Sequence, residues 1–168
     1  MSILTDNMKR TVNAERLAFI ATVCPDGTPN VRPIGTLKGW DDDHLVFACI
    51  RSASTLRNLA ENPAIEINVV DPFIRKGYRF KGTASVHTEG PTYEEGVSLY
   101  TDRGFFEASN LIQAIVRVRV EEAEPLVSPA YARPVSEADV AEHWTAHYEN
   151  LLRWNPPRRT PDVEDGPS

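Results

Sequence analysis

The sequence predicts a mainly β protein, a small antiparallel barrel that carries peripheral helices. Two observations support this fold class. Short apolar runs are joined by tight-turn signals such as PDGT at 25–28, which is the pattern of antiparallel hairpins. The expected strands also do not alternate regularly with helices, as they would in a doubly wound parallel sheet.

The first third of the chain predicts one helix followed by three strands. Residues 4–17 form the helix, which Thr5 or Asp6 can cap. The run LAFIATVC at 17–24 is a strand, and Gly27 can take the positive φ that the PDGT turn needs. A second strand follows in 29–40. DDD at 41–43 marks another turn before a third strand at 44–50.

The period changes to a helical one at 52–63, SASTLRNLAENP. Leu56, Leu59 and Ala60 fall at positions i, i+3 and i+4. We expect Ser52 or Ser54 to cap this helix, and the pair Asn62-Pro63 to end it.

The remaining chain predicts strands at 64–71, 75–87 and 111–126. A helix with Thr92 as its cap is expected in 92–108, and a C-terminal helix in 136–154. Ser136 and Asp139 form a pair like a capping box at the start of the last helix. The sum is six or so strands with three or four helices.

Composition restricts the class of protein. The 168 residues suit one domain, expected over 1–154, with a proline-rich tail at 155–168. The net charge of −6 argues against nucleic acid as a partner. We find no signal peptide and no apolar run near the ~20 residues of a membrane helix, so we expect a cytoplasmic protein without a membrane partner. Cys24 and Cys49 lie in apolar runs and are expected to be buried thiols.

The stretch VRPIGT at 31–36 places Pro33 and Gly35 within an expected strand. Pro33 has no N–H to donate, and Gly35 has no side chain. Together they can expose backbone groups to a flat ligand such as a planar heterocycle. The alternative is a β-bulge or an edge strand that binds nothing.

The stretch SASTLRNL at 52–59 gathers hydroxyls and bases at the start of a helix. A helix N-terminus presents unpaired N–H groups and the positive end of the helix dipole, which suit a phosphate. Ser52, Ser54 and Thr55 add hydroxyl donors, while Arg51 and Arg57 add charge. An ordinary capped surface helix explains the same residues equally well.

Four cations lie within seven residues at 75–81, namely Arg75, Lys76, Arg79 and Lys81. They form either a solvated strand face or a cationic wall beside a bound anion. His143 and His147 are four residues apart on the C-terminal helix, but no HExxH motif is present. We therefore expect no metal site.

The order of RPIG-T, S-x-T-x-x-N-L-x-x-N-P and K-G-T-A, each followed or preceded by a strand, resembles the pyridoxamine 5′-phosphate oxidase-like family of FMN-binding split barrels. The resemblance covers roughly residues 17–87, with a looser match through Val120. It implies a six-stranded antiparallel split barrel, a homodimer, and FMN at the dimer interface.

The resemblance also implies which residues bind the cofactor. Backbone groups of one stretch would line the isoalloxazine ring: Arg32, Pro33, Ile34, Gly35 and Thr36. Another set would hold the phosphate and ribityl chain: Ser52, Ser54, Thr55, Arg57 and Asn58. Lys81 would face the flavin or its phosphate from the other side.

The function implied is an FMN-dependent oxidoreductase acting on a small molecule. Ser54 and Thr55 stand where authentic pyridoxamine phosphate oxidases carry Arg-Lys or Lys, and STLRNL is closer to flavin-reductase-like split barrels. We therefore expect a substrate other than pyridoxamine phosphate. No catalytic side chain stands out, as is usual where the cofactor performs the chemistry. The alternative function is a carrier of flavin, deazaflavin or haem without turnover.

Overall fold

The computed structural model describes residues 3–15, 17–101 and 111–154. The proline-rich tail at 155–168 therefore lies outside the described residues, as does the end of the helix expected in 92–108. The described elements are, in chain order, α1 (Asp6–Ala14), β1 (Ala18–Val23), β2 (Pro29–Ile34), β3 (Lys38–Gly39), β4 (His44–Cys49), α2 (Ala53–Glu61), β5 (Ala64–Asp71), β6 (Lys76–His87), α3 (Pro91–Thr101), β7 (Ala114–Val127), the 3₁₀ helix η2 (Pro129–Ala132) and α4 (Glu137–Arg153).

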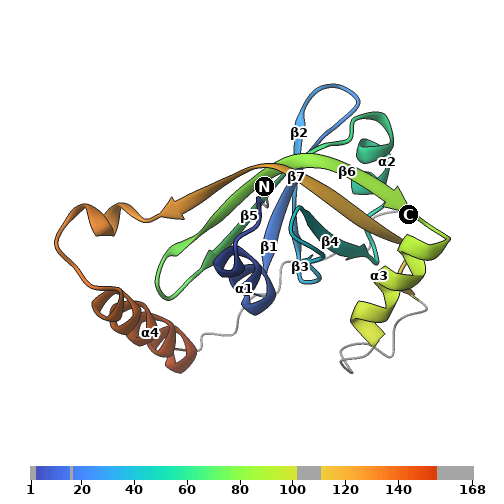
Figure 1. Cartoon of the computed structure of the whole chain (residues 1–168). Helices are drawn as coiled ribbons and strands as arrows, with labels where there is room; N and C mark the ends of the chain where they lie inside the picture. Colours follow the sequence, from blue (N-terminus) through green and yellow to red (C-terminus); the bar gives the residue numbers. More distant parts are fainter. Residues whose placement is uncertain (1–2, 16, 102–110, 155–168) are drawn as a thin grey trace.

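The strands form one antiparallel sheet in the order β2-β1-β5-β6-β7-β4-β3. Figure 1 shows this sheet curling, with α1 beneath the arch of β6 and β7 and with α4 set apart at the far end of the long β6–β7 pair. The predicted antiparallel split-barrel class is confirmed. The described sheet has seven strands, because the run expected as one strand in 29–40 divides into β2 and the two-residue β3.

The helix boundaries follow capping chemistry. Thr5 caps α1 by accepting a hydrogen bond from the N–H of Met8, as predicted. Ser136 and Asp139 form the expected capping box of α4. The cap predicted at Thr92 is wrong, because α3 already begins at Pro91. Proline suits a first helical position, where no N–H is needed.

Two apolar clusters lie on the two sides of β4. Phe47, Phe80 and Ile67 are fully buried inside the curl of the sheet. On the outer side, α3 packs against Val46 and Ile115. Every residue from Leu45 to Cys49 is therefore buried, and this makes β4 a rigid support for whatever its C-terminal end holds.

Glycine is required where β6 meets its neighbours. A Cβ on Gly77 would lie 2.0 Å from the carbonyl oxygen of Val69, and one on Gly82 would lie 2.0 Å from that of Arg119. The register between β6 and β7 shifts between Lys81 and Gly82, so Glu121 is an extra residue on β7. This bulge decides which side chains of β7 face outward.

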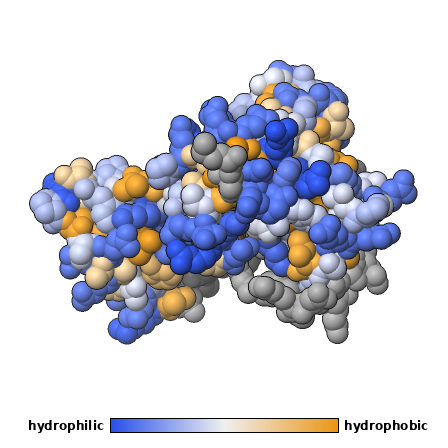
Figure 2. Space-filling model, in the orientation of Figure 1, coloured by the Kyte–Doolittle hydropathy of each residue, from blue (hydrophilic) through white to orange (hydrophobic). Residues whose placement is uncertain are grey.

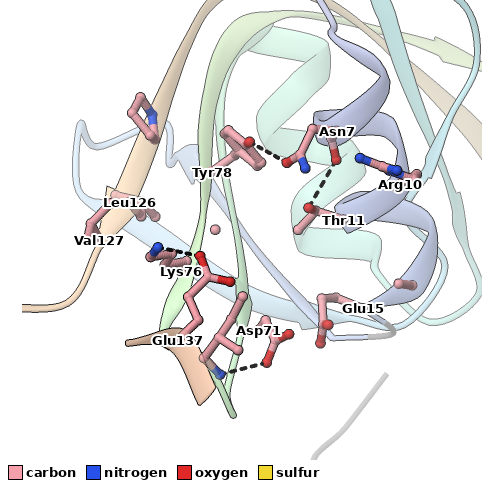
Figure 3. A pocket seen from close by; sticks show the side chains of 14 residues that line it. Asn7, Arg10, Thr11, Glu15, Asp71, Lys76, Tyr78, Leu126, Val127 and Glu137 are labelled. Carbon is pink, nitrogen blue, oxygen red and sulfur yellow. Dashed lines mark hydrogen bonds and ion pairs between the residues drawn. The ribbon is translucent and has the colours of Figure 1, made fainter. Parts of the chain in front are cut away.

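A cleft of about 480 Å³ separates α1 from the β5–β6 turn, β7 and the start of α4. Figure 3 shows hydrogen bonds and an ion pair between several of its polar side chains. The Tyr78 hydroxyl donates to Asn7 Oδ1 at 2.5 Å, and Lys76 Nζ lies 2.5 Å from Glu137 Oε1. Arg75 also lies over the Trp144 ring at 3.6 Å. Lys76 and Arg75 therefore attach α4 to the sheet beside this cleft.

Glu15 carries an electrostatic cost in this cleft. Burial, and then the negative charge of Asp71, raise the pKa of Glu15. A folded-state pKa above the unfolded value means that stability is lost as pH rises through it. Glu15→Gln is therefore expected to raise the thermal midpoint at pH 7, with a difference that shrinks in acid. Scanning calorimetry from pH 7 to pH 3 measures this effect.

The matched control for this change is Glu89→Gln, at an exposed position with no hydrogen bond or ion pair among the described residues. It removes the same charge without the same surroundings. An equal gain in both variants at pH 7 would show that only net charge matters, and would contradict the local cost assigned to Glu15.

Candidate functional site

The site begins where the chain passes from one edge of the curled sheet to the other. β2 is an edge strand, and Pro33 lies within it opposite Phe19. An edge strand tolerates the missing N–H of proline, so the alternative explanation of Pro33 accounts for its place in the strand. After Ile34 the chain leaves the sheet at Gly35 and crosses to β3 at the opposite edge.

Hydrogen bonds fix this crossing against β4. The Thr36 hydroxyl donates to the carbonyl of Ala48 at 2.9 Å and accepts from its N–H at 3.2 Å. The Tyr100 hydroxyl donates to the carbonyl of Thr36 at 2.6 Å, and burial raises the pKa of Tyr100 well above its usual range. The Thr36 side chain is thus a structural clamp, while the crossing holds the 32–36 stretch beside the end of β4.

The same end of β4 leads into α2. Arg32 Nη1 donates to Ser54 Oγ at 3.2 Å, which joins the VRPIGT stretch to the start of α2. Arg57 lies three residues after Ser54, on the same side of the helix. Arg57 is exposed and has no ion pair within the described part of the chain. Arg32 and Ser54 therefore meet at the start of α2, and Arg57 follows about one turn further along the same side of the helix.

The N-terminus of α2 is open to an acceptor. Ser52 occupies the N-cap position but makes no side-chain capping hydrogen bond, so the first N–H groups of the helix lack the usual capping acceptor. Within the described residues, Thr55 Oγ1 is fully buried and has no hydrogen-bond partner. An unpaired buried hydroxyl costs about 1–3 kcal/mol, a cost that a ligand oxygen or a water would remove.

Cys49 lies beside Ser52 and Arg32, next to the N-terminus of α2. Burial raises the pKa of its thiol to about 11, although a hydrogen bond with Ser52 and the positive charge of Arg32 act in the opposite direction. The sequence predicts only that Cys49 is a buried thiol, and the structure confirms its burial. Its position at the end of an apolar strand, three residues before Ser52, is the signal that could have placed it here.

The pKa of Cys49 gives a direct test of this environment. At pH 8 only about a thousandth of the thiol is ionised. In a Cys24→Ser variant we expect almost no alkylation by iodoacetamide in the native state, and full alkylation in denaturant. Native labelling as fast as that of a free thiol would contradict the buried placement. Mass spectrometry gives the readout.

Two predicted site residues are directed elsewhere. The side chain of Asn58 is buried and donates to Thr22 Oγ1 at 3.0 Å and to Cys24 Sγ at 3.6 Å. It ties α2 to β1 and has little capacity left for a ligand. Lys81 is exposed on β6 and forms no ion pair with any described residue.

Lys81 and Arg32 lie on opposite faces of the sheet. The register places Arg32 in one row with buried Ile20, Ile67 and Phe80, on the inner face. Lys81 belongs to the next row, which runs across the outer face through Val31, Ala21, Glu66, Lys81 and Glu122. One chain therefore does not bring Lys81 to the Arg32–Ser54 group.

The other cations near Lys81 have partners of their own. Arg79 contacts Glu66 and Glu124. Arg75 and Lys76 contact α4 instead. They do not form a wall beside the start of α2. Among the described residues no group of three His, Cys, Asp or Glu side chains could hold a metal ion. No described helix is long and apolar enough to span a membrane.

Comparison with known families gives a match over most of the chain. The family model described as pyridoxamine 5′-phosphate oxidase matches residues 4–127. A protein of unknown function from Methanocaldococcus jannaschii is 33% identical over 89 residues, which is 52% of this chain and 58% of that protein. A pyridoxine/pyridoxamine 5′-phosphate oxidase from Rhodopseudomonas palustris is 33% identical over 84 residues, 50% of this chain and 39% of that protein. The chain thus spans about half the length of these relatives.

Solved structures share the fold. HupZ of Group A Streptococcus is 34% identical with a TM-score of 0.65, covering 74% of this chain and 94% of that one. An F420 reductase is 25% identical with a TM-score of 0.57, covering 71% and 98%. An FMN-binding protein of Syntrophomonas wolfei shares the fold at 18% identity, with a TM-score of 0.63 and coverage of 74% and 87%.

Proposed function

Because the chain belongs to the pyridoxamine 5′-phosphate oxidase family, we propose that it binds FMN and acts as an oxidoreductase on a small organic molecule. The observation that carries this proposal is the hydrogen bond between Arg32 and Ser54 at the uncapped N-terminus of α2. It brings a guanidinium, a hydroxyl and a helix N-terminus to one point. Those are the groups that bind a phosphate.

The residues present fit a phosphate monoester better than an uncharged ligand. Arg32 and Arg57 supply positive charge in a chain whose net charge is −6. The partnerless hydroxyl of Thr55 and the first N–H groups of α2 supply donors. FMN carries such a phosphate and riboflavin does not, so the site separates the two flavins by charge.

Bound FMN would supply hydride and electron transfer, while the protein binds and orients it. Arg32 would hold the phosphate through its guanidinium fork. The crossing at Gly35–Thr36, clamped to Ala48 and Tyr100, would offer backbone groups to the ring. Buried Cys49 would stay a neutral thiol beside the site.

We also propose that two copies of the chain complete the site. Lys81 reaches a flavin at Arg32 only from a second copy, because the two residues lie on opposite faces of one sheet. The outer face beside Lys81 carries exposed apolar side chains that could pack against a second copy. Phe19 is 47% exposed and Val31 is 62% exposed, on neighbouring strands.

Light scattering after size-exclusion chromatography tests the dimer. We expect a dimer for the native chain and a monomer for Val31→Glu. Trp154→Glu is the matched control, because Trp154 is also exposed, at 72%, but follows α4. Dimers in both variants would remove this face from the proposal.

The visible spectrum of the freshly purified protein tests the function itself. A yellow protein that releases FMN on heating, and that consumes NAD(P)H in the presence of an acceptor, is the expected result. A protein that holds flavin, deazaflavin or haem without consuming any donor would be a carrier. A colourless protein that takes up no FMN would overturn the proposal.

A further inference from the structure

A second group of cations lies on the outer face of the sheet, over β4, β7 and β6. Arg117 and Arg119 are two residues apart on β7, so their side chains point to the same face. Across the register, Arg119 stands between His44 and Thr83, and Arg117 stands between Val46 and Ser85. Figure 1 shows these three strands side by side.

The β-bulge at Glu121 creates this group. Before the bulge, the outward-facing residues of β7 are Arg117 and Arg119. After it, the outward positions opposite Lys81 and Arg79 are Glu122 and Glu124. The extra residue thus divides the outer face of β7 into a basic half and an acidic half.

The two arginines lack internal counter-ions. Neither guanidinium forms a hydrogen bond or an ion pair with any residue that the structure describes. Arg79, on the acidic half of the same face, contacts Glu66 and Glu124. Unpaired guanidinium forks side by side on a rigid strand are preorganised for oxyanions.

A cavity of about 430 Å³ lies over these residues, and its lining consists of His44, Thr83, Ala84, Ser85, Arg117, Arg119 and Glu121. An adjacent cavity of about 460 Å³ shares Arg119 and Glu121 and is also lined by Ile3, Asp43 and Val120; we call the two cavities together the groove. Small-molecule sites commonly fall in this range of volume. Figure 2 shows that the described surface on this side is mostly hydrophilic, with hydrophobic residues scattered over it.

Hydrogen bonds hold the other polar groups of the groove in place. Glu121 is the carboxylate shared by both cavities, and its Oε1 accepts from the Thr83 hydroxyl at 2.7 Å. His44 Nδ1 lies 2.9 Å from Asp41 Oδ1. Ser85 Oγ lies 2.9 Å from His87 Nε2. Burial, and then the positive charge of Arg117, lower the pKa of His87.

We propose that this groove binds a small molecule that carries two oxyanion groups, phosphate or carboxylate. The Cα atoms of residues i and i+2 of a strand are about 6.7 Å apart, so the two guanidinium groups can contact separate oxyanion groups of one ligand. The groove is separate from the Arg32–Ser54 group. It opens on the outer face, and β4 places His44 and Cys49 at opposite ends, about 17 Å apart along the strand.

Calorimetric titration of the full chain with inorganic diphosphate tests the proposal, with succinate and orthophosphate as comparison ligands. We expect saturable binding of diphosphate or succinate, weakened about tenfold by Arg117→Gln or Arg119→Gln and about a hundredfold by both. The ligand that binds identifies the source of the oxyanions. Arg133→Gln, at an exposed position, is the control for the loss of one charge.

Both arginines face outward, so the variants are expected to keep the native thermal midpoint and an unchanged affinity for FMN. Failure of this proposal is therefore distinguishable from failure of the flavin site. No heat with either ligand up to about 10 mM, or equal binding by the double variant, would overturn it. Orthophosphate binding as tight as diphosphate would overturn the assignment of two groups.

Discussion

Arg32→Ala is expected to weaken FMN binding by about a hundredfold while leaving riboflavin binding nearly unchanged. The guanidinium of Arg32 donates to Ser54 at the open N-terminus of α2, where we place the phosphate. A charge-assisted hydrogen bond to phosphate contributes about 3 kcal/mol, which corresponds to roughly two decades in Kd. Fluorescence quenching titrations with both flavins measure the two affinities.

Two further variants make this result specific. Arg32→Lys keeps the charge but loses the fork that also reaches Ser54, so an intermediate loss is expected. Arg133→Ala removes an exposed arginine elsewhere and should change neither affinity. Equal losses of affinity for FMN and riboflavin in Arg32→Ala would contradict the placement of the phosphate beside Arg32. Replacing Arg57 and Thr55 by alanine should likewise affect FMN far more than riboflavin.

Gly82→Ala is expected to cost about 3 kcal/mol of unfolding free energy, or to prevent folding altogether. The new Cβ would lie 2.0 Å from the carbonyl oxygen of Arg119 and 2.9 Å from its carbonyl carbon. These are backbone atoms of a paired strand and cannot move aside without breaking the ladder between β6 and β7. Urea denaturation followed by circular dichroism gives the midpoint and slope.

Gly39→Ala is the matched control for this substitution. Its Cβ would meet only side-chain atoms, the nearest being those of Lys9 at 3.4 Å and Asn13 Nδ2 at 3.9 Å, so a change within about 0.5 kcal/mol is expected. A Gly82→Ala protein as stable as Gly39→Ala would contradict the close strand contact at the bulge. Misfolding of Gly82→Ala alone would agree with it.

Local patterns predicted the fold well because local chemistry determines its turns and caps. Gly27 has a φ of 82° in the PDGT turn, and the strands on each side of it pair as a hairpin. Thr5 and Ser136 cap their helices as expected. The two-residue β3 was missed, since so short a strand exists only through its pairing with β4.

The structure brings together only some of the predicted site residues, because sequence shows which donors exist and not which partner each one finds. Arg32 and Ser54, 22 residues apart, do meet. Thr36 and Asn58 instead satisfy internal acceptors at Ala48 and Thr22. Lys81 lies on the outer face, next to inward-facing Phe80, and its separation from Arg32 depends on the pairing of four strands.

The ratio of the dissociation constants of the native chain for riboflavin and FMN shows whether the site binds a phosphate. If Arg32 and the N-terminus of α2 hold a phosphate, FMN should bind at least about a hundredfold more tightly than riboflavin, and the ratio should fall as salt is added. Equal affinity for the two flavins, or no binding of either, would contradict a phosphate site at Arg32 and the N-terminus of α2.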